Sequence, residues 1–154
     1  MSGKIYIDDK TWQALQLKVA KIGQMHAKVG ILFDDDHGDF GMVELMAVHE
    51  YGSPAAGIPE RAPIRRTFEE NEDKVGKFCA RLAKEVVEGR MTGEEALNLL
   101  GAFGVNELKK FIVAGKATPE LAEETIRRKG SSTPLIDTGR LLNAITWLVE
   151  TIDA

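Results

Sequence analysis

A proline-punctuated segment near the middle of the chain, residues 49–68 (HEYGSPAAGIPERAPIRRTF), constrains the fold more than any other feature. Gly52 supplies the left-handed residue that commonly follows a helix end, and prolines stand at positions 54, 59 and 63. Proline cannot continue a helix, and it biases the residue before it toward extended backbone. We therefore predict an extended loop over residues 52–63, exposed for contact with a partner, between two helices.

Segments with the period-two pattern of strands lie near both ends of the chain. Near the N-terminus they are residues 4–8 and residues 27–33, separated by a helix that ends at Gly23. Residues 147–152 read as a closing strand. Because a lone terminal edge would be poorly held, we expect this strand to join the N-terminal pair in one sheet.

Two long amphipathic segments follow the proline-rich loop. Residues 64–88 carry apolar side chains at steps of mostly three and four, which predicts a long helix packed along one side. Thr92 and Glu95 have the spacing of a capping box at the start of a second long helix. Inside that helix Gly101 and Gly104 cost about 1 kcal/mol each relative to alanine, which indicates a close helix crossing. The two helices are expected to form a hairpin.

The last third of the chain completes the prediction of fold class. Residues 118–130 read as a shorter third helix, and Asp137 can cap one helical turn over residues 139–144. At 154 residues the chain is expected to form a single domain over residues 1–154. We predict an α+β fold, in which a small, mostly antiparallel sheet from the N-terminal and C-terminal strands packs against helices that include the long hairpin.

Composition restricts the classes of partner. The net charge of -4 and the pI near 5.5 argue against a protein whose main affinity is for phosphate backbones, so at most weak contact with DNA is expected. No apolar run approaches the length of a membrane span, and the first residues lack the apolar region of a signal peptide, so we expect no membrane partner. The single cysteine, Cys79, falls at an apolar helical position and is interpreted as a packed, unreactive thiol.

Candidate catalytic residues are few. The loop over residues 34–39 contains His37 and four carboxylates, and carboxylates are the hard oxygen ligands that Ca²⁺ or Mg²⁺ prefers, but the loop lacks the spacing of an EF-hand. His49 and Glu50 begin the zinc-protease motif H-E-x-x-H, yet Ser53 stands where the second histidine is needed. No G-x-S-x-G nucleophile turn is present. We expect no metal, no cofactor and no enzymatic activity.

Four sequence blocks carry a family resemblance. They are a Val-Gly strand at residues 28–33, E-Y-G-S at 50–53, I-P-x-R-x-x-x-R-x-x-F at 58–68, and R-R-K-G-S-S-T-P-L-I-D-T-G-R-L at 127–141. In this order and at these lengths, the blocks resemble the head-to-tail joining proteins of tailed bacteriophages and prophages, which are called tail-completion, neck or minor tail components. The family block more often has Phe at the position of Ile64.

The resemblance implies a structural role in virion morphogenesis. A member of this family would be a subunit of an oligomeric ring at the head-tail junction, made in the bacterial host cytoplasm and located in the virion. Its partners would be further copies of itself, six to match the tail or twelve to match a connector, and the neighbouring connector and tail proteins.

The same blocks contain the expected interface residues. A rigid proline followed by an arginine on an exposed loop suits binding, because proline reduces the ordering entropy and the guanidinium offers a planar fork to a carboxylate. Arg140 has two interpretations, as part of a helix cap or as an ion-pair partner between subunits. The predicted interface residues are Tyr51, Gly52, Ile58, Pro59, Arg61, Arg65 and Arg140.

Two other function classes stay open. The first is a metal-dependent hydrolase or nuclease that uses the acidic loop at residues 34–39. The second is a prophage-encoded regulatory protein that binds a host protein or DNA, although the acidic charge balance argues against DNA.

Overall fold

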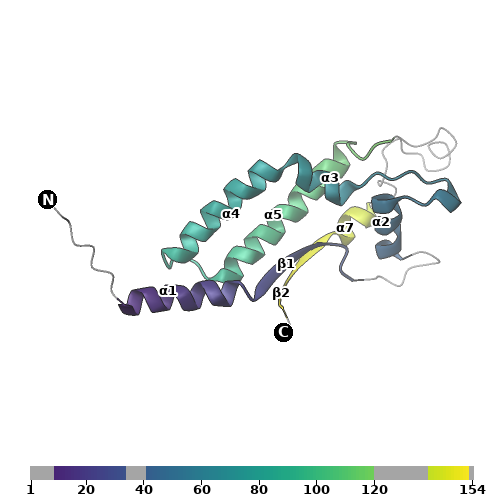
Figure 1. The fold of residues 1–154 in the computed structure, drawn as a ribbon. Helices are drawn as coiled ribbons and strands as arrows, with labels where there is room; N and C mark the ends of the chain where they lie inside the picture. Colours follow the sequence, from purple (N-terminus) through teal and green to yellow (C-terminus); the bar gives the residue numbers. More distant parts are fainter. Residues whose placement is uncertain (1–8, 34–40, 120–138, 153–154) are drawn as a thin grey trace.

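The computed structural model describes residues 9–33, 41–119 and 139–152. Within them, helices and a two-stranded antiparallel sheet form an elongated α+β molecule (Figure 1), which confirms the predicted fold class. The expected strand at residues 4–8 and the acidic loop at 34–39 lie outside the described residues. The third helix is also outside them, apart from its expected first two residues.

In chain order the described elements are α1 (Asp9–Ile22), β1 (Met25–Gly30), α2 (Met42–Tyr51), a short 3-10 helix (Pro54–Ala56), α3 (Pro63–Glu70), α4 (Glu72–Val87), α5 (Gly93–Val113), α7 (Arg140–Ala144) and β2 (Thr146–Thr151).

Helix α5 is the centre of the molecule and contacts α1, α3, α4 and both strands. It begins at the predicted capping box, in which the Thr92 hydroxyl accepts the Glu95 N–H and the Glu95 carboxylate accepts the Thr92 N–H. Leu108 and Ile112 are fully buried at 0% exposed, and they anchor the main hydrophobic core. With α4 it forms the expected helical hairpin, in which the rings of Phe78 and Phe103 stack with centroids 4.6 Å apart.

The two glycines inside α5 allow the sheet to approach closely, and at Gly104 the ring of Phe68 from α3 packs beside it. A Cβ atom at Gly101 would lie 2.4 Å from Cδ1 of Trp147, and one at Gly104 would lie 3.0 Å from Cγ2 of Val29. Val29 and Trp147 face each other across the antiparallel strand pair. The predicted helix crossing is therefore mainly a contact with the sheet: Trp147 alone fills the space at Gly101, and Val29 shares the space at Gly104 with Phe68 of α3.

The opposite face of the sheet carries charged side chains beside the exposed Leu148. Glu150 on β2 accepts from Nε2 of its cross-strand neighbour His26 at 3.0 Å, and its carboxylate also forms an ion pair with Lys28. The hydrogen bond from Lys28 lowers the pKa of Glu150, and the hydrogen bond from His26 lowers it further. Partial burial of the carboxylate opposes this shift. The strands thus alternate between a packed face toward α5 and a charged outer face.

The predicted single helix over residues 64–88 is interrupted. Helix α3 ends at Glu70 and α4 begins at Glu72, and between them Asn71 has φ -113° and ψ 15°. The side-chain amide of Asn71 donates to the carbonyl of Thr67 at 2.8 Å, the acceptor that the next helical turn would use. This competing hydrogen bond is a local reason for the break, which the apolar spacing alone did not reveal.

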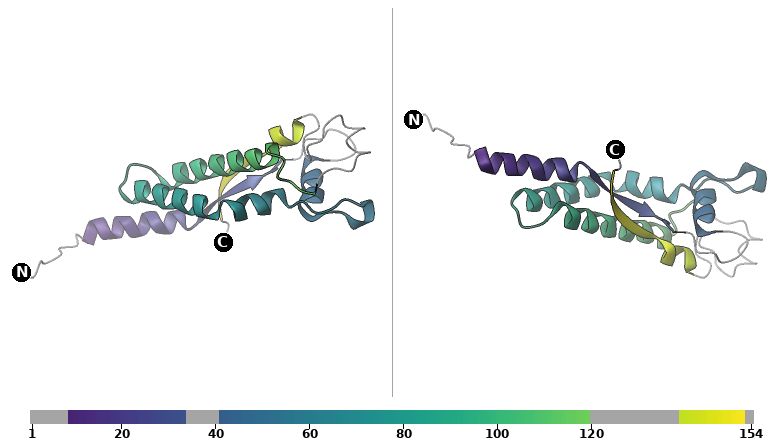
Figure 2. Two further views of the ribbon diagram at one scale, coloured as in Figure 1. Left: turned by 90° about the horizontal axis from the view of Figure 1, so that it is seen from above. Right: turned by 90° about the horizontal axis from the view of Figure 1, so that it is seen from below.

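Helix α1 crosses the free end of the hairpin and extends beyond it (Figure 2). At the crossing, Ile22 lies directly against Gly93, where an added Cβ would come within 2.3 Å of the isoleucine side chain. No residue of α1 is buried, and Trp12 is 51% exposed. The apolar face of α1, which includes Leu15, Val19 and Ile22, lies toward the hairpin but is only partly covered.

The glycine-mediated packing gives a first prediction, with a matched control in the same hairpin. Gly101→Ala should destabilise the protein by about 1–3 kcal/mol, because the new methyl group overlaps Trp147. Gly76→Ala, on α4 with open space around its Cα, should instead stabilise it by about 0.5–1 kcal/mol through helix propensity. Urea unfolding measures both free energies, and shifts of the same sign would contradict the packing described here.

Candidate functional site

Blocks far apart in the sequence meet at one end of the molecule, opposite the free end of the hairpin (Figure 1). Helix α2, the loop after it and the start of α3 form this end, and α7 packs against α2. Met46 of α2 and Leu141 of α7 belong to the same buried core. The described parts of three of the four resemblance blocks therefore gather in one region.

The loop after α2 is a folded turn and not the continuous extended segment that the prolines suggested. Gly52 ends α2 with the positive φ of 76° that glycine tolerates, although its ψ of 174° lies outside the left-handed helical region that was expected, and its N–H donates to the Val48 carbonyl at 2.8 Å. Ser53 and Ile58 then exchange two backbone hydrogen bonds of 2.8 and 2.9 Å around the 3-10 helix. The turn includes Gly57 in the left-handed conformation, φ 64°. Paired backbone bonds thus close the loop on itself.

The buried carboxylate of Glu50 joins α2 to the start of α3. Its two oxygens accept the backbone N–H groups of Ile64 and Arg65 at 2.8 and 3.0 Å. These N–H groups belong to the first turn of α3, where no intrahelical acceptor exists and where a negative charge is favoured by the helix dipole. Glu50 therefore acts as an N-cap supplied from a different helix.

A second contact of this junction is made by Arg61, which is only 4% exposed. Its guanidinium donates to the carbonyl of Pro119 at 3.0 Å, to Nδ1 of His49 at 3.3 Å and to the carbonyl of Pro59 at 3.4 Å. Because arginine can only donate, Nδ1 of His49 must be the acceptor and carries no proton in this arrangement. Burial lowers the pKa of the Arg61 guanidinium.

The junction also depends on the His49 backbone. Its carbonyl accepts the N–H groups of Arg61 and Ala62 at 2.9 and 3.1 Å. Ala62 is a non-glycine residue in the left-handed conformation, φ 45°, which is a strained geometry that the surrounding hydrogen bonds maintain. We refer to His49, Glu50, Arg61, Ile64 and Arg65 as the α2–α3 junction.

Arg61 does not lie on the surface where the sequence analysis expected it. That expectation was wrong because the loop folds back onto α2, which carries the guanidinium into the protein. Arg65 is exposed, and its guanidinium forms ion pairs with Glu60 and, at 3.9 Å, with Glu69. The side-chain hydrogen bond to Glu60 raises the pKa of Arg65.

The remaining predicted interface residues lie on or near the surface of the same end. Tyr51 is 76% exposed, Pro59 is exposed, and Gly52 and Ile58 are partly buried in the turn. Arg140 is exposed at the first position of α7. Asp137, which would decide whether Arg140 belongs to a helix cap, lies outside the described residues.

Sequence reasoning missed the role of Glu50. The residue was noted only as part of a motif and of an incomplete zinc pattern, whereas it caps α3 from fourteen residues away. One signal was available: Ala62 precedes Pro63 at the helix start, and alanine offers no side-chain acceptor for the first N–H groups. A helix without a local cap requires an acceptor from elsewhere when its start is packed against the protein.

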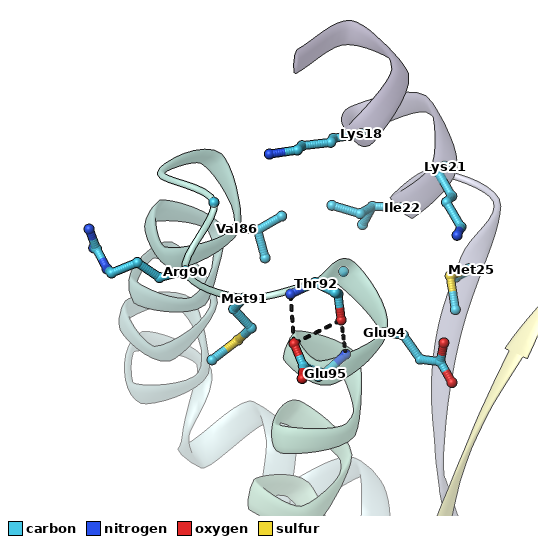
Figure 3. Close-up of a pocket in the computed structure, with 12 residues that line it drawn as sticks. Lys18, Lys21, Ile22, Met25, Val86, Arg90, Met91, Thr92, Glu94 and Glu95 are labelled. Carbon is cyan, nitrogen blue, oxygen red and sulfur yellow. Dashed lines mark hydrogen bonds between the residues drawn. The ribbon is translucent and has the colours of Figure 1, made fainter. Parts of the chain in front are cut away.

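A cavity of about 480 Å³ lies at the opposite end of the molecule, where α1 crosses the hairpin turn (Figure 3). It combines Lys18 and Lys21 of α1 with Glu94 and Glu95 of α5. Glu95 is already committed to the capping box, where the Thr92 N–H and hydroxyl lower the pKa of its carboxyl. Arg90 points away from the cavity and is paired with Glu85. The mixed charge gives this cavity no preference for an anion or a cation.

The described part of the chain contains no cluster of three or more His, Cys, Asp or Glu side chains arranged to hold a metal ion. The acidic loop at residues 34–39, on which the metal-dependent alternative depends, lies outside the described residues. Among the described helices, none has the length and apolar character needed to cross a membrane. Cys79 is partly buried on α4.

Comparison with known proteins does not add an assignment. No protein-family model, no curated protein and no solved structure matches the chain significantly. The functional interpretation therefore depends on the α2–α3 junction, on the exposed residues beside it and on the resemblance of the four sequence blocks.

The two arginines of the loop and α3 should respond differently to truncation. Arg61→Ala should destabilise the isolated protein by about 1–3 kcal/mol, because it removes a buried side chain together with its hydrogen bonds to His49 and Pro119. Arg65→Ala removes an exposed ion pair and should change stability by no more than about 0.5 kcal/mol. Thermal or urea unfolding distinguishes the two. If both variants unfold like the wild type, Arg61 does not stabilise the junction.

Proposed function

We propose that this protein is a structural subunit of the head-tail junction of a tailed bacteriophage or prophage, where it forms a ring that completes the tail or joins it to the capsid connector. It acts by binding and not by catalysis. Its partners are further copies of itself, in a ring of six or twelve, and the adjoining connector and tail proteins. It is made in the host cytoplasm and is located in the virion.

The observation that carries this proposal is the gathering of the resemblance blocks at one end of the molecule. The E-Y-G-S block ends α2, the I-P-x-R block forms the loop and the start of α3, and Arg140 begins α7 beside them. Some residues of these blocks, such as Glu50 and Arg61, are buried and maintain the junction. Others, such as Tyr51, are exposed and available to a partner. Exposed residues that are held by a rigid, buried junction suit a protein-protein contact, because little conformational entropy is lost on binding.

The proposal is tested by removing the protein from the phage that encodes it. A stop codon early in the gene should give lysates that contain DNA-filled heads and separate tails, because the junction cannot close. Expression of the wild-type chain in trans should restore joined, infective particles. Electron microscopy and plaque titre measure both outcomes. Normal joined particles without the protein would overturn the proposed function.

A surface charge reversal tests the junction end of the molecule. Arg140→Glu should lower the yield of joined particles while it leaves the melting temperature of the isolated protein unchanged, because the side chain is exposed. Lys77→Glu is the matched control, since Lys77 is also exposed and lies on α4, which is not part of this end. Equal losses of yield in the two variants would point to net charge and not to an interface at Arg140.

A further inference from the structure

The tip of the folded loop, residues 54–59, is an exposed and uncharged projection. Its sequence is Pro-Ala-Ala-Gly-Ile-Pro, in a chain of which 29% of residues are charged. All of these residues except Ile58 are exposed. The paired hydrogen bonds between Ser53 and Ile58 hold its shape, and the α2–α3 junction holds its base. Binding through this tip would therefore cost little ordering entropy.

An apolar groove lies at the other end of the molecule, between α1 and the α4–α5 hairpin. Its volume is about 440 Å³, and Lys18 is the single charged residue among those that line it. Val19 of α1 and Val87 of α4 line it while 57% and 53% exposed. We call this hollow the α1 groove.

Helix α1 lacks the tertiary packing that a helix of its length needs. It has fourteen residues and no buried side chain. Isolated helices of this length are marginal in water, and in proteins most of their stability comes from tertiary packing of an apolar face. A partner that fills the α1 groove would cover that face. Because the groove walls are apolar apart from Lys18, an uncharged partner segment would enter the groove with the smallest desolvation cost.

We propose that the loop tip of one copy of this chain binds in the α1 groove of the next copy. The tip and the groove match in polarity, since both are uncharged apart from Lys18. They lie at opposite ends of an elongated molecule in every view (Figures 1 and 2), so one copy cannot fill its own groove. Contact between two unlike surfaces is head-to-tail association, which generates a ring if the rotation closes.

This inference rests on the proposed function and names the subunit contact of its ring. Each copy contributes one tip and one groove, so ring closure uses all copies of both surfaces. A single tip is small and its contact is weak, whereas closure makes the last contact intramolecular and strengthens the whole assembly. The ring is therefore expected to form at high protein concentration or on the particle.

The chain's one cysteine provides a direct test, because Cys79 lines the α1 groove. Ala55→Cys and Ala56→Cys each add a thiol at the exposed tip. Air oxidation catalysed by copper-phenanthroline removes two electrons and two protons from a thiol pair and forms a disulfide, which requires Cα atoms within about 7 Å. Head-to-tail binding predicts a ladder of covalent oligomers up to the ring size on non-reducing gels, both from concentrated protein and from purified particles.

Matched variants decide whether the crosslink reports this contact. Adding Cys79→Ser should abolish the ladder and leave at most dimers. Ala83→Glu adds a charge to the wall of the groove and should also abolish it, whereas Ala80→Glu, on an exposed position of α4 outside the groove, should retain it. Melting curves of the uncrosslinked proteins check that both glutamate variants are folded.

The possible results distinguish a failure of the tip-in-groove contact from a failure of the proposed function. Rings or particles that contain the protein but give no ladder with either tip cysteine would overturn tip-in-groove binding and leave the ring role intact. Dimers alone, dependent on Cys79, would indicate a two-fold contact and would also overturn it. A ladder that persists in Ala83→Glu would mean that the crosslink forms outside the groove. Joined particles produced without the protein would overturn the proposed function itself.

Discussion

The arrangement of the molecule depends on the close approach of the sheet to helix α5. Gly101 and Gly104 leave room for Trp147 and Val29, so the two strands lie directly on the helix. The same helix buries Leu108 and Ile112 against the elements at the junction end. One helix therefore supports two layers, and a side chain at either glycine would separate the sheet from the core. This explains why a long helix tolerates two residues that disfavour helical structure.

Two polar residues of the resemblance blocks, Glu50 and Arg61, are buried in the α2–α3 junction and stabilise the fold. Glu50 supplies the cap that α3 lacks, and the buried Arg61 donates hydrogen bonds to Nδ1 of His49 and to the carbonyl of Pro119. Both residues form hydrogen bonds within one chain, and these bonds are sufficient to explain why the two residues occur in the resemblance blocks. The exposed residues of the same motif, Tyr51, Pro59 and Arg65, are the ones left for intermolecular contact. A folded base with a projecting tip has less entropy to lose on binding than a disordered loop.

Local patterns predicted most of the elements. Helix α2 ends directly before Gly52 as expected, the capping box begins α5, and the C-terminal strand pairs with the N-terminal one. Each of these features is determined by residues within a few positions of each other or by a simple alternation. The interruption at Asn71 was missed, because a single side-chain hydrogen bond overrides an apolar spacing that continues through it. The turn at the loop tip was missed because proline restricts φ without specifying which backbone groups will pair.

The sequence by itself determined that α2 ends before Gly52, that α5 begins at a capping box, and that the α5 glycines mark a close approach. These are short-range consequences of capping, periodicity and side-chain size. Only the tertiary structure decided which element approaches those glycines, that Glu50 caps a helix fourteen residues away, and that Arg61 is buried while Arg65 is exposed. The two arginines have similar local sequence contexts. Their environments differ because the loop folds back onto α2, and the path of a chain between distant segments is set by packing and not by local propensity.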